Sequence, residues 1–457
     1  MATINFENLG NIEKGTVELN NFTIFTGSNN TGKTYATYAI YSLLDKDFNF
    51  RLTELDEIIN ILYKEGFYTI DLIDFFDKHY MNIKQKIEKE FSKSLSFIFS
   101  ATEDEFKKSK VSFDLEQKNI KNNIQQIKYI DNFDIGKKDI NILEIIKEEN
   151  TFLLKLVLLE NHFPKKIIND KIKMILNQLL FNELFSNTFL LPAERTGLNL
   201  FYRELSSKRT AIFHHLRKSE VDIGELIKDL IISKYPQPIA DYIDFLNQTY
   251  DYKKNSSSFK DLAQEIKKEL IKGRYEVDKD GIYFLPYKKD SNKNNYTKKI
   301  SLHLTSSTVK TFFSLVFYLE HLAQKDDTLI IDEPELNLHP DNQRKIARIL
   351  SMIANRGIKV IVSTHSDYFI REINNLIMLS EDFESRDELL KKYQYNKKML
   401  VPVNKLNAYL FEDNTIKKME TTLSEGIIAT TFDDAINGLN ESNDEIYYQK
   451  EADLSDD

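Results

Sequence analysis

The chain has 457 residues, of which 41% are hydrophobic and 29% are charged, so it is long enough for a full hydrophobic core and two lobes. Its formal net charge of -9 argues against a general nucleic-acid coat, and the absence of cysteine excludes disulfides, cysteine-based zinc sites and thiol catalysis. The sequence has neither an apolar run of membrane-spanning length nor a signal-peptide pattern, so we expect a cytoplasmic protein with no membrane partner.

The first 45 residues predict the start of an α/β domain. Two strands are expected within 2–26, and the second of them, 21–26, leads directly into a glycine-rich loop. Apolar residues at helical spacing then predict a helix over 35–44. A phosphate-binding loop requires this order of strand, loop and helix.

A large insertion is expected over 46–185. Apolar side chains from Phe76 to Phe91 recur at spacings of three and four residues, which places them on one face of a helix. A second helical pattern covers 143–159, and alternating apolar residues predict a short strand at 111–115. We interpret the segment as a mostly α-helical insertion that contacts a trigger, an effector or other subunits.

The rest of the chain predicts a return to the α/β domain. A second part of the domain, with a helical region and a hairpin, is expected over 186–300, and a third part over 301–400. Strands, a short helix and a disordered acidic tail are expected over 401–457. In the third part strands alternate with helices, which predicts a parallel sheet covered by helices. Its expected elements are a helix at 307–323, a strand at 328–331, a helix at 341–355, a strand at 359–362 and a helix from Asp367.

The glycine-rich loop matches the pattern G-x-x-x-x-G-K-[ST] in full. In such a loop, successive backbone N–H groups surround phosphate oxygens at the start of a helix. Lys33 would reach the β- and γ-phosphates of ATP, and Thr34 would offer a hydroxyl to Mg²⁺. A chance match in a turn is the alternative, and the strand and helix around the loop argue against it. The loop residues are Gly27, Ser28, Asn29, Asn30, Thr31, Gly32, Lys33 and Thr34.

Two downstream strands end in polar residues that suit the same site. Asp332 and Glu333 follow the apolar strand 328–331. We expect Asp332 to hold Mg²⁺ through water and Glu333 to act as the general base on the attacking water. His365 follows the next strand and would hydrogen-bond the γ-phosphate or the attacking water. The carboxyl ends of parallel strands meet at one edge of a sheet, so these residues are expected beside Lys33. An acidic turn and a helix-capping histidine are the alternatives.

Three segments together resemble the ABC-type ATPase heads of the OLD, RecF and SMC proteins. They are the loop 27–34, the run Asp-Glu-Pro-Glu-Leu-Asn-Leu-His-Pro at 332–340, and Ser-Thr-His-Ser at 363–366. The second segment is the most specific, and it is similar to the OLD-like branch found in prokaryotic anti-phage systems such as Gabija, Septu and PARIS. The stand-alone ATPase subunit of PARIS is the most similar of these. The resemblance is good over 1–45 and 300–380, loose over 186–300 and absent from the insertion.

This resemblance implies an α/β P-loop ABC-type ATPase head, with a mixed β-sheet flanked by helices, that binds ATP and Mg²⁺ and hydrolyses ATP. It also implies that heads form dimers or higher homo-oligomers around nucleotide, with a serine of one subunit contacting the γ-phosphate bound by the other. Ser306 and Ser307 are the candidates, and a helix cap is the alternative function for them. Thr308 replaces the glycine usual in the family, so hydrolysis is expected to be slow. Glu194 and Arg195 resemble a segment near the ABC glutamine loop; they would contact nucleotide or form a structural ion pair.

A nuclease domain is not expected in this chain. The Toprim nuclease of full OLD proteins needs an Asp-x-Asp pair, and none follows His365. The chain therefore resembles a sensor or motor without its effector. We interpret it as the ATP-binding and ATP-hydrolysing switch subunit of a bacterial anti-phage defence system. In this hypothesis a phage-derived trigger and nucleotide-dependent head association control a separate effector protein, such as a Toprim nuclease.

Two other functions stay open. A RecF- or SMC-type DNA-repair ATPase would bind nucleic acid through basic patches, which the net charge makes the less favoured interpretation. The candidate patches are 288–299 and the group Lys165, Lys166, Lys171 and Lys173. A stand-alone toxin would use His214 and His215 with Arg217, although an exposed helix face is the plainer interpretation of these residues.

Overall fold

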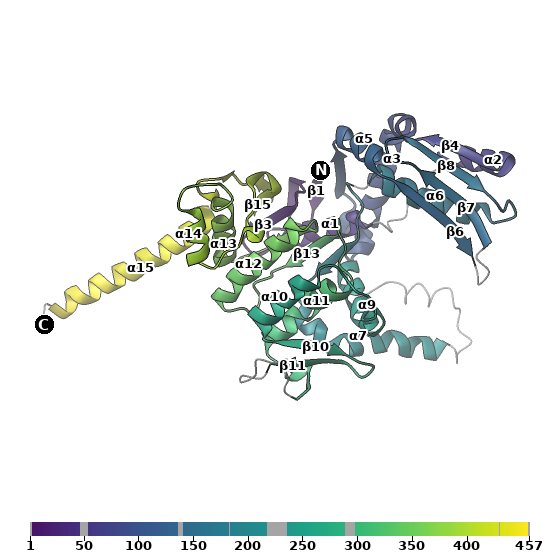
Figure 1. Cartoon of the computed structure of the whole chain (residues 1–457). Coiled ribbons are helices and arrows are strands. Elements are labelled where there is room, and N and C mark those ends of the chain that lie inside the picture. Colours follow the sequence, from purple (N-terminus) through teal and green to yellow (C-terminus); the bar gives the residue numbers. More distant parts are fainter. Residues whose placement is uncertain are drawn as a thin grey trace.

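The computed structural model describes residues 2–45, 54–135, 140–181, 183–216, 235–287, 298–428 and 430–455. These residues form a central mixed sheet of nine strands, in the order β5-β1-β2-β16-β15-β3-β14-β13-β9 (Figure 1). Helices flank the sheet, which confirms the expected α/β fold. The strands are β1 (Ala2–Leu9), β2 (Ile12–Glu18), β3 (Phe22–Gly27), β5 (Lys110–Leu115), β9 (Thr188–Leu191), β13 (Thr328–Asp332), β14 (Lys359–Ser363), β15 (Leu406–Glu412) and β16 (Thr415–Lys418).

Five neighbouring strands, β15-β3-β14-β13-β9, run parallel to one another. Every residue of β13 is buried, so both faces of this part of the sheet are covered. Helix α1 (Lys33–Leu44) packs against β3, β9, β13 and β14, and α12 (Pro340–Asn355) packs against β14. The register places Asp332 opposite Ser363 and Ser363 opposite Phe25, so the carboxyl ends of these strands reach the same edge.

The other side of the sheet is mostly antiparallel. β1 and β2 form a hairpin where the sequence predicted a single strand before 21–26. Gly10 turns the chain there with a left-handed φ of 56°. β5 comes from the segment expected to be an insertion, yet it pairs with β1. β16 forms a hairpin with β15 and pairs with β2, so the first and last parts of the chain are interleaved in one sheet.

The segment 46–185 contains both helices and strands. Its second sheet is antiparallel, in the order β4-β8-β7-β6. The prediction of a helix over 143–159 is wrong, because strands β7 and β8 form this region. The buried residues Leu154, Leu156 and Leu158 alternate with Lys155 and Val157, which is a strand period. The elements are α2 (Leu55–Glu65), β4 (Phe67–Asp71), α3 (Leu72–Ile98), α4 (Glu103–Phe106), α5 (Gln117–Gln126), β6 (Tyr129–Ile135), β7 (Ile140–Lys147), β8 (Leu153–Leu158) and α6 (Lys165–Leu180).

The segment of the chain between β9 and β13 is mostly helical and contains a small hairpin. It contains the expected helices, the expected hairpin and the expected helix that begins after Ser306. Its elements are α7 (Arg195–Leu216), α9 (Gln237–Tyr252), α10 (Lys260–Ile266), the π-helical turn η1 (Lys267–Ile271), β10 (Gly273–Val277), β11 (Ile282–Pro286), β12 (Ile300–Ser301), the 3₁₀ turn η2 (Leu302–Leu304) and α11 (Ser307–His321).

The end of the chain differs from its prediction. A helix, α15 (Thr430–Ser455), replaces the expected short helix and extends away from the rest of the molecule (Figure 1). The disorder expected over 451–457 is therefore wrong as far as Ser455, and 456–457 lie outside the described residues. Glutamate, lysine and glutamine are good helix formers, so an acidic composition alone does not indicate disorder. No helix of the described chain is long and apolar enough to cross a membrane. Before α15 lie α13 (Asp367–Met378), α14 (Arg386–Lys392), η3 (Lys397–Met399), η4 (Val403–Lys405), β17 (Thr421–Thr422) and β18 (Gly426–Ile427).

Candidate nucleotide site

The glycine-rich loop lies at the carboxyl end of β3 and leads into α1. Gly27 and Gly32 both have left-handed φ angles, of 136° and 99°. A Cβ on Gly27 would lie 2.3 Å from the carbonyl oxygen of Phe411, so only glycine fits between this loop and β15. The backbone N–H groups from Asn29 to Thr34 donate to no described residue. These unpaired donors at a helix N-terminus fit the phosphate groups of a nucleotide.

Lys33 is 7% exposed and folds back over its own loop. Its Nζ donates to the carbonyl oxygens of Gly27 at 3.0 Å and Ser28 at 2.7 Å. Burial lowers the pKa of Lys33, while the nearby carboxylates of Asp332 and Glu333 oppose this effect. The ammonium group is therefore held inside the loop, close to both acidic residues.

Asp332 and Ser363 meet at the carboxyl ends of β13 and β14. Asp332 is 4% exposed, and its Oδ1 accepts a hydrogen bond from the Ser363 hydroxyl. Burial raises the pKa of Asp332 to about 6, while the Ser363 hydroxyl opposes this shift. Thr34, in the first turn of α1, is exposed. A hydroxyl and a carboxylate on the edge that carries the phosphate loop are oxygen ligands of the kind that Mg²⁺ prefers.

Glu333 and His365 face each other beside the loop. The Glu333 Oε1 lies 3.9 Å from the His365 Nε2, and both side chains are about one-third exposed, at 32% and 31%. Burial and the charge of Lys33 lower the pKa of His365, so its imidazole is neutral at neutral pH. The structure therefore brings together Lys33, Asp332, Glu333 and His365, which were expected at one edge of the sheet.

Two residues have roles that sequence reasoning missed. The Oε1 of Glu335 accepts a hydrogen bond of 2.7 Å from the backbone N–H of His365, and burial raises the pKa of Glu335. Arg195 is 2% exposed and donates to backbone carbonyl oxygens, including that of Asp332 at 2.7 Å, rather than to a carboxylate. Glu194 is exposed. Glu335 lies within the run 332–340, and Arg195 was expected to contact nucleotide or form an ion pair, but neither pattern predicts these backbone contacts.

Ser306 and Ser307 lie at the exposed start of α11. The Ser306 side chain accepts a hydrogen bond from the N–H of Val309 and so caps the helix. The Thr308 hydroxyl donates to the carbonyl oxygen of Asn337, 3.3 Å away, which connects this start to the segment after Glu333. Ser306 therefore acts as a cap in this chain, and the Ser307 side chain is open to another subunit.

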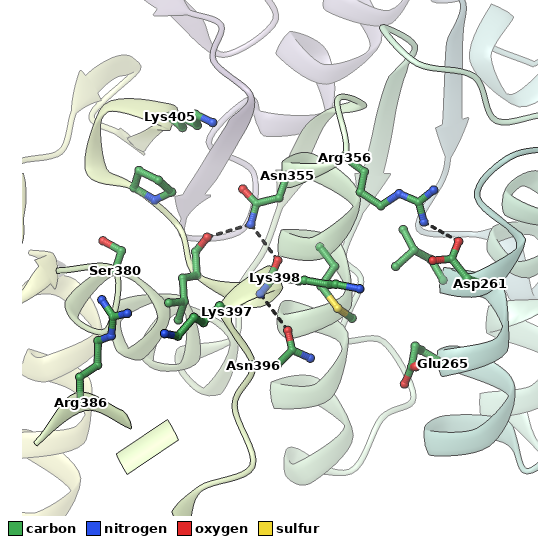
Figure 2. A pocket seen from close by; sticks show the side chains of 14 residues that line it. Asp261, Glu265, Asn355, Arg356, Ser380, Arg386, Asn396, Lys397, Lys398 and Lys405 are labelled. Carbon is green, nitrogen blue, oxygen red and sulfur yellow. Dashed lines mark hydrogen bonds and ion pairs between the residues drawn. The ribbon is translucent and has the colours of Figure 1, made fainter. Parts of the chain in front are cut away.

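A cavity of about 770 Å³ lies at the opposite edge of the sheet (Figure 2). Asn355 and Arg356 come just before β14, and Pro402 and Lys405 come just before β15, so this part of the lining lies at the amino ends of these strands. Another part of the lining comes from α10. Arg356 pairs with Asp261, and the Asn355 side chain donates to the carbonyl oxygens of Lys398 and Leu400. Figure 2 shows charged groups that pair locally or point apart rather than converge on one point. The cavity is therefore separate from the phosphate loop and has no convergent set of ligands.

The fold and the edge occupied by Lys33, Asp332 and Glu333 define a P-loop ATPase. A protein-family model described as an AAA ATPase domain matches residues 1–370, and the chain belongs to this family. Such domains hydrolyse ATP, which they bind generally with Mg²⁺. No curated protein matches the chain.

Two solved structures of SMC heads are similar to the chain at low identity. One is the Smc head domain with an extended coiled coil bound to the C-terminal domain of ScpA, from Pyrococcus furiosus. It has 11% identity and a TM-score of 0.33, and the alignment covers 97% of this chain and 100% of that one. The other is an SmcHead bound to the C-winged helix domain of ScpA, with 11% identity, a TM-score of 0.32 and coverage of 92% and 98%. Similarity this low indicates no function.

Proposed function

We propose that the chain is an ABC-type ATPase switch whose heads associate around ATP and control a separate effector in anti-phage defence. The observation that carries the ATPase part is the convergence of Lys33, Asp332, Glu333 and His365 at one edge of the sheet. The defence role rests on the resemblance of the segment 332–340 to OLD-like ATPases.

Each residue of the site has a distinct task in this proposal. Lys33 leaves the carbonyl oxygens of its own loop and pairs with the β- and γ-phosphates. Thr34 and Asp332 hold Mg²⁺, which neutralises phosphate charge when it is bound. Glu333 accepts the proton of the attacking water, and the neutral imidazole of His365 orients this water or the γ-phosphate.

Head association would complete the site. The exposed Ser307 and the start of α11 offer hydrogen-bond donors to the γ-phosphate bound by another subunit. Leu304 is 71% exposed just before this start, which suits a surface that becomes buried between heads. Thr308 in place of glycine supports slow hydrolysis, so the ATP-bound assembly would be long-lived. A phage product would trigger the switch, and the effector would be a separate nuclease.

Two substitutions test the ATPase part. Lys33→Ala should weaken ATP binding at least about tenfold, because the phosphates lose their cation. Glu333→Gln should leave binding intact and lower kcat at least about a hundredfold, because the base is lost, so that ATP-bound dimers accumulate. Binding is measured by calorimetry, kcat by phosphate release and dimers by mass photometry. Lys391→Ala and Glu388→Gln, both on exposed positions of α14, serve as matched controls. An unchanged kcat in Glu333→Gln contradicts the assignment.

The defence part needs a separate test in cells. Each variant is expressed together with the gene next to this one, and phage plating efficiency is measured. We expect Lys33→Ala and Glu333→Gln to lose protection and the two α14 controls to keep it. Full protection in both site variants would show that ATP does not drive the switch.

Three of the described lysines in the candidate DNA-binding patches already have partners in the chain. Lys171 pairs with Asp131, and Lys165 donates to Asn60. Lys299 pairs with two carboxylates, while 288–297 lies outside the described residues. Submicromolar duplex binding with a steep salt dependence would favour this alternative.

The stand-alone toxin alternative rests on His214, His215 and Arg217. The side chains of His214 and His215, on α7, and all of Arg217 lie outside the described part of the chain. Toxicity in cells that lack any partner gene would favour this function.

A further inference from the structure

We propose that Arg195 is a positioning residue that sets the orientation of Glu333 and connects it, through α7, to α11. This inference rests on the proposed function, in which Glu333 is the general base and α11 carries the serine that faces another subunit. It concerns the structural coupling between Glu333 and α11, and it involves no contact between Arg195 and ATP.

The Arg195 guanidinium binds three backbone carbonyl oxygens. Its Nη1 donates to Asp332 at 2.7 Å and to Pro192 at 2.9 Å, and its Nη2 donates to Glu333 at 2.7 Å. The side chain is 2% exposed, so water cannot replace these bonds without a change in packing. The planar guanidinium presents several donors in a fixed geometry, which the single nitrogen of a lysine cannot reproduce.

These contacts control the backbone on both sides of Glu333. The carbonyl of Asp332 belongs to the peptide before Glu333, and the carbonyl of Glu333 belongs to the peptide after it. The first peptide is also held at its other end, because the Glu333 N–H donates to the carbonyl of Ser363 at 2.9 Å. Glu333 has a left-handed φ of 49°, which a residue with a side chain adopts only when its surroundings hold it there. Arg195 therefore fixes the direction in which the Glu333 side chain leaves the backbone.

A buried hydrogen-bond network continues from Arg195 to α11. Arg195 begins α7, and the next residue, Thr196, shares a hydroxyl hydrogen bond of 3.0 Å with Thr311 of α11. One turn later, Asn199 donates to the carbonyl of Lys310 at 2.8 Å. The Tyr242 hydroxyl donates to Asn199 Oδ1 at 2.9 Å, which fixes the orientation of that amide.

Because the hydrogen bonds between α7 and α11 are largely buried, they couple the positions of the two helices. Asn199 and Thr311 are 3% and 2% exposed, so a shift of α11 relative to α7 would leave buried polar groups unpaired. The low-cost response is for α7, with Arg195 at its start, to move together with α11. A contact made at the start of α11 by a second subunit would thus change the position of Glu333.

The main test is Arg195→Lys. This substitution keeps the positive charge but removes the planar set of donors that binds the three carbonyl oxygens. We therefore expect kcat to fall at least about tenfold while KM for ATP stays within about twofold. Arg203→Lys is the matched control, because Arg203 also lies on α7 and donates to a backbone carbonyl, that of Lys279, at an exposed position. A purely structural role for Arg195 would lower the melting temperature and change KM and kcat together.

Thr311→Val tests the connection to α11 without changing Arg195. It removes one hydroxyl and keeps the shape, so we expect about a threefold loss of kcat. In the double variant Arg195→Lys/Thr311→Val, the loss of kcat should be smaller than the two single losses combined. Both substitutions act through α7, so their effects are not independent. If Arg195→Lys fails to fold, the kcat of Thr311→Val alone decides the test.

The outcomes separate this inference from the proposed function. If Glu333→Gln abolishes hydrolysis but Arg195→Lys and Thr311→Val keep the wild-type kcat, the inference is wrong and the ATPase assignment stands. If Glu333→Gln leaves hydrolysis unchanged, the proposed function itself is wrong.

Discussion

Asp241 is a carboxylate in α9 whose surroundings oppose its ionisation. It is partly buried, and burial raises its pKa to about 6, while the hydroxyl of Tyr41, which donates to Asp241 at 3.0 Å, opposes this shift. The negative charges of Asp45 and Asp244 raise the pKa further. The folded chain thus binds this proton more tightly than the unfolded chain, whose aspartate pKa is about 3.9. The stabilisation from Asp241 is complete below about pH 4 and is lost as the pH rises through about 6.

The first prediction concerns Asp241→Asn. The amide cannot ionise and still offers an oxygen to Tyr41, so at pH 7.5 the variant should be more stable than the wild type by about 1–3 kcal/mol. The difference should narrow towards pH 4.5. Urea unfolding of both proteins between pH 4.5 and pH 7.5 measures this difference in unfolding free energy. The control is Asp251→Asn, at an exposed position on the same helix, whose unfolding free energy should change with pH as that of the wild type does. If the unfolding free energies of Asp241→Asn and the wild type differ by the same amount at every pH, the assigned pKa shift is wrong.

At the scale of elements, α12 and α13 are joined by a buried charge cluster. Glu372 of α13 is 1% exposed and accepts hydrogen bonds from the Nε atoms of Arg344 and Arg348, which lie one turn apart on α12. The Arg348 guanidinium also lies 4.2 Å from the centre of the Tyr395 ring. These contacts hold the helix after β14 against the helix after β13.

We predict that Glu372→Gln lowers the free energy of unfolding by about 2–4 kcal/mol, because Arg348 then keeps a largely buried charge without its counter-ion. Arg344 is 41% exposed, so water compensates for part of its loss. Urea denaturation measures the effect. Glu90→Gln breaks an exposed pair with Lys93 and should change the unfolding free energy by less than about 1 kcal/mol. Equal effects of the two substitutions would contradict this account.

Elements with a strong local signal could be predicted from the sequence. β13 and β14 are short apolar runs that end at polar residues, and the loop before α1 follows a known pattern, so their positions and their common edge were expected. The strands at 143–159 were missed, because Ile145 and Ile146 are adjacent and fit a helical stripe as well as a strand. The pairing of β5 with β1 depends on distant segments. The role of Arg195 was missed because binding to backbone carbonyls leaves no pattern in the sequence.

At the scale of the whole molecule, α15 is an appendage. Leu439, Ile446, Tyr447 and Tyr448 are all more than half exposed, at 69%, 68%, 56% and 69%. We predict that removal of 438–457 leaves the melting temperature within about 2 °C and kcat within about twofold of the intact chain, because every described side chain of this stretch is exposed. Calorimetry and phosphate release measure this. A drop of about 10 °C would show that the helix packs on the body.

The interleaved sheet has a consequence for biosynthesis. β3, which carries the phosphate loop, lies between β14 and β15, so its two neighbours are made more than 330 residues after it. Because such long-range pairings form late, the loop lacks both of its neighbouring strands on the ribosome until β14 and β15 have been synthesised. We therefore expect that a nascent chain that ends before β14, and so lacks Ser363 and His365, cannot form the complete site.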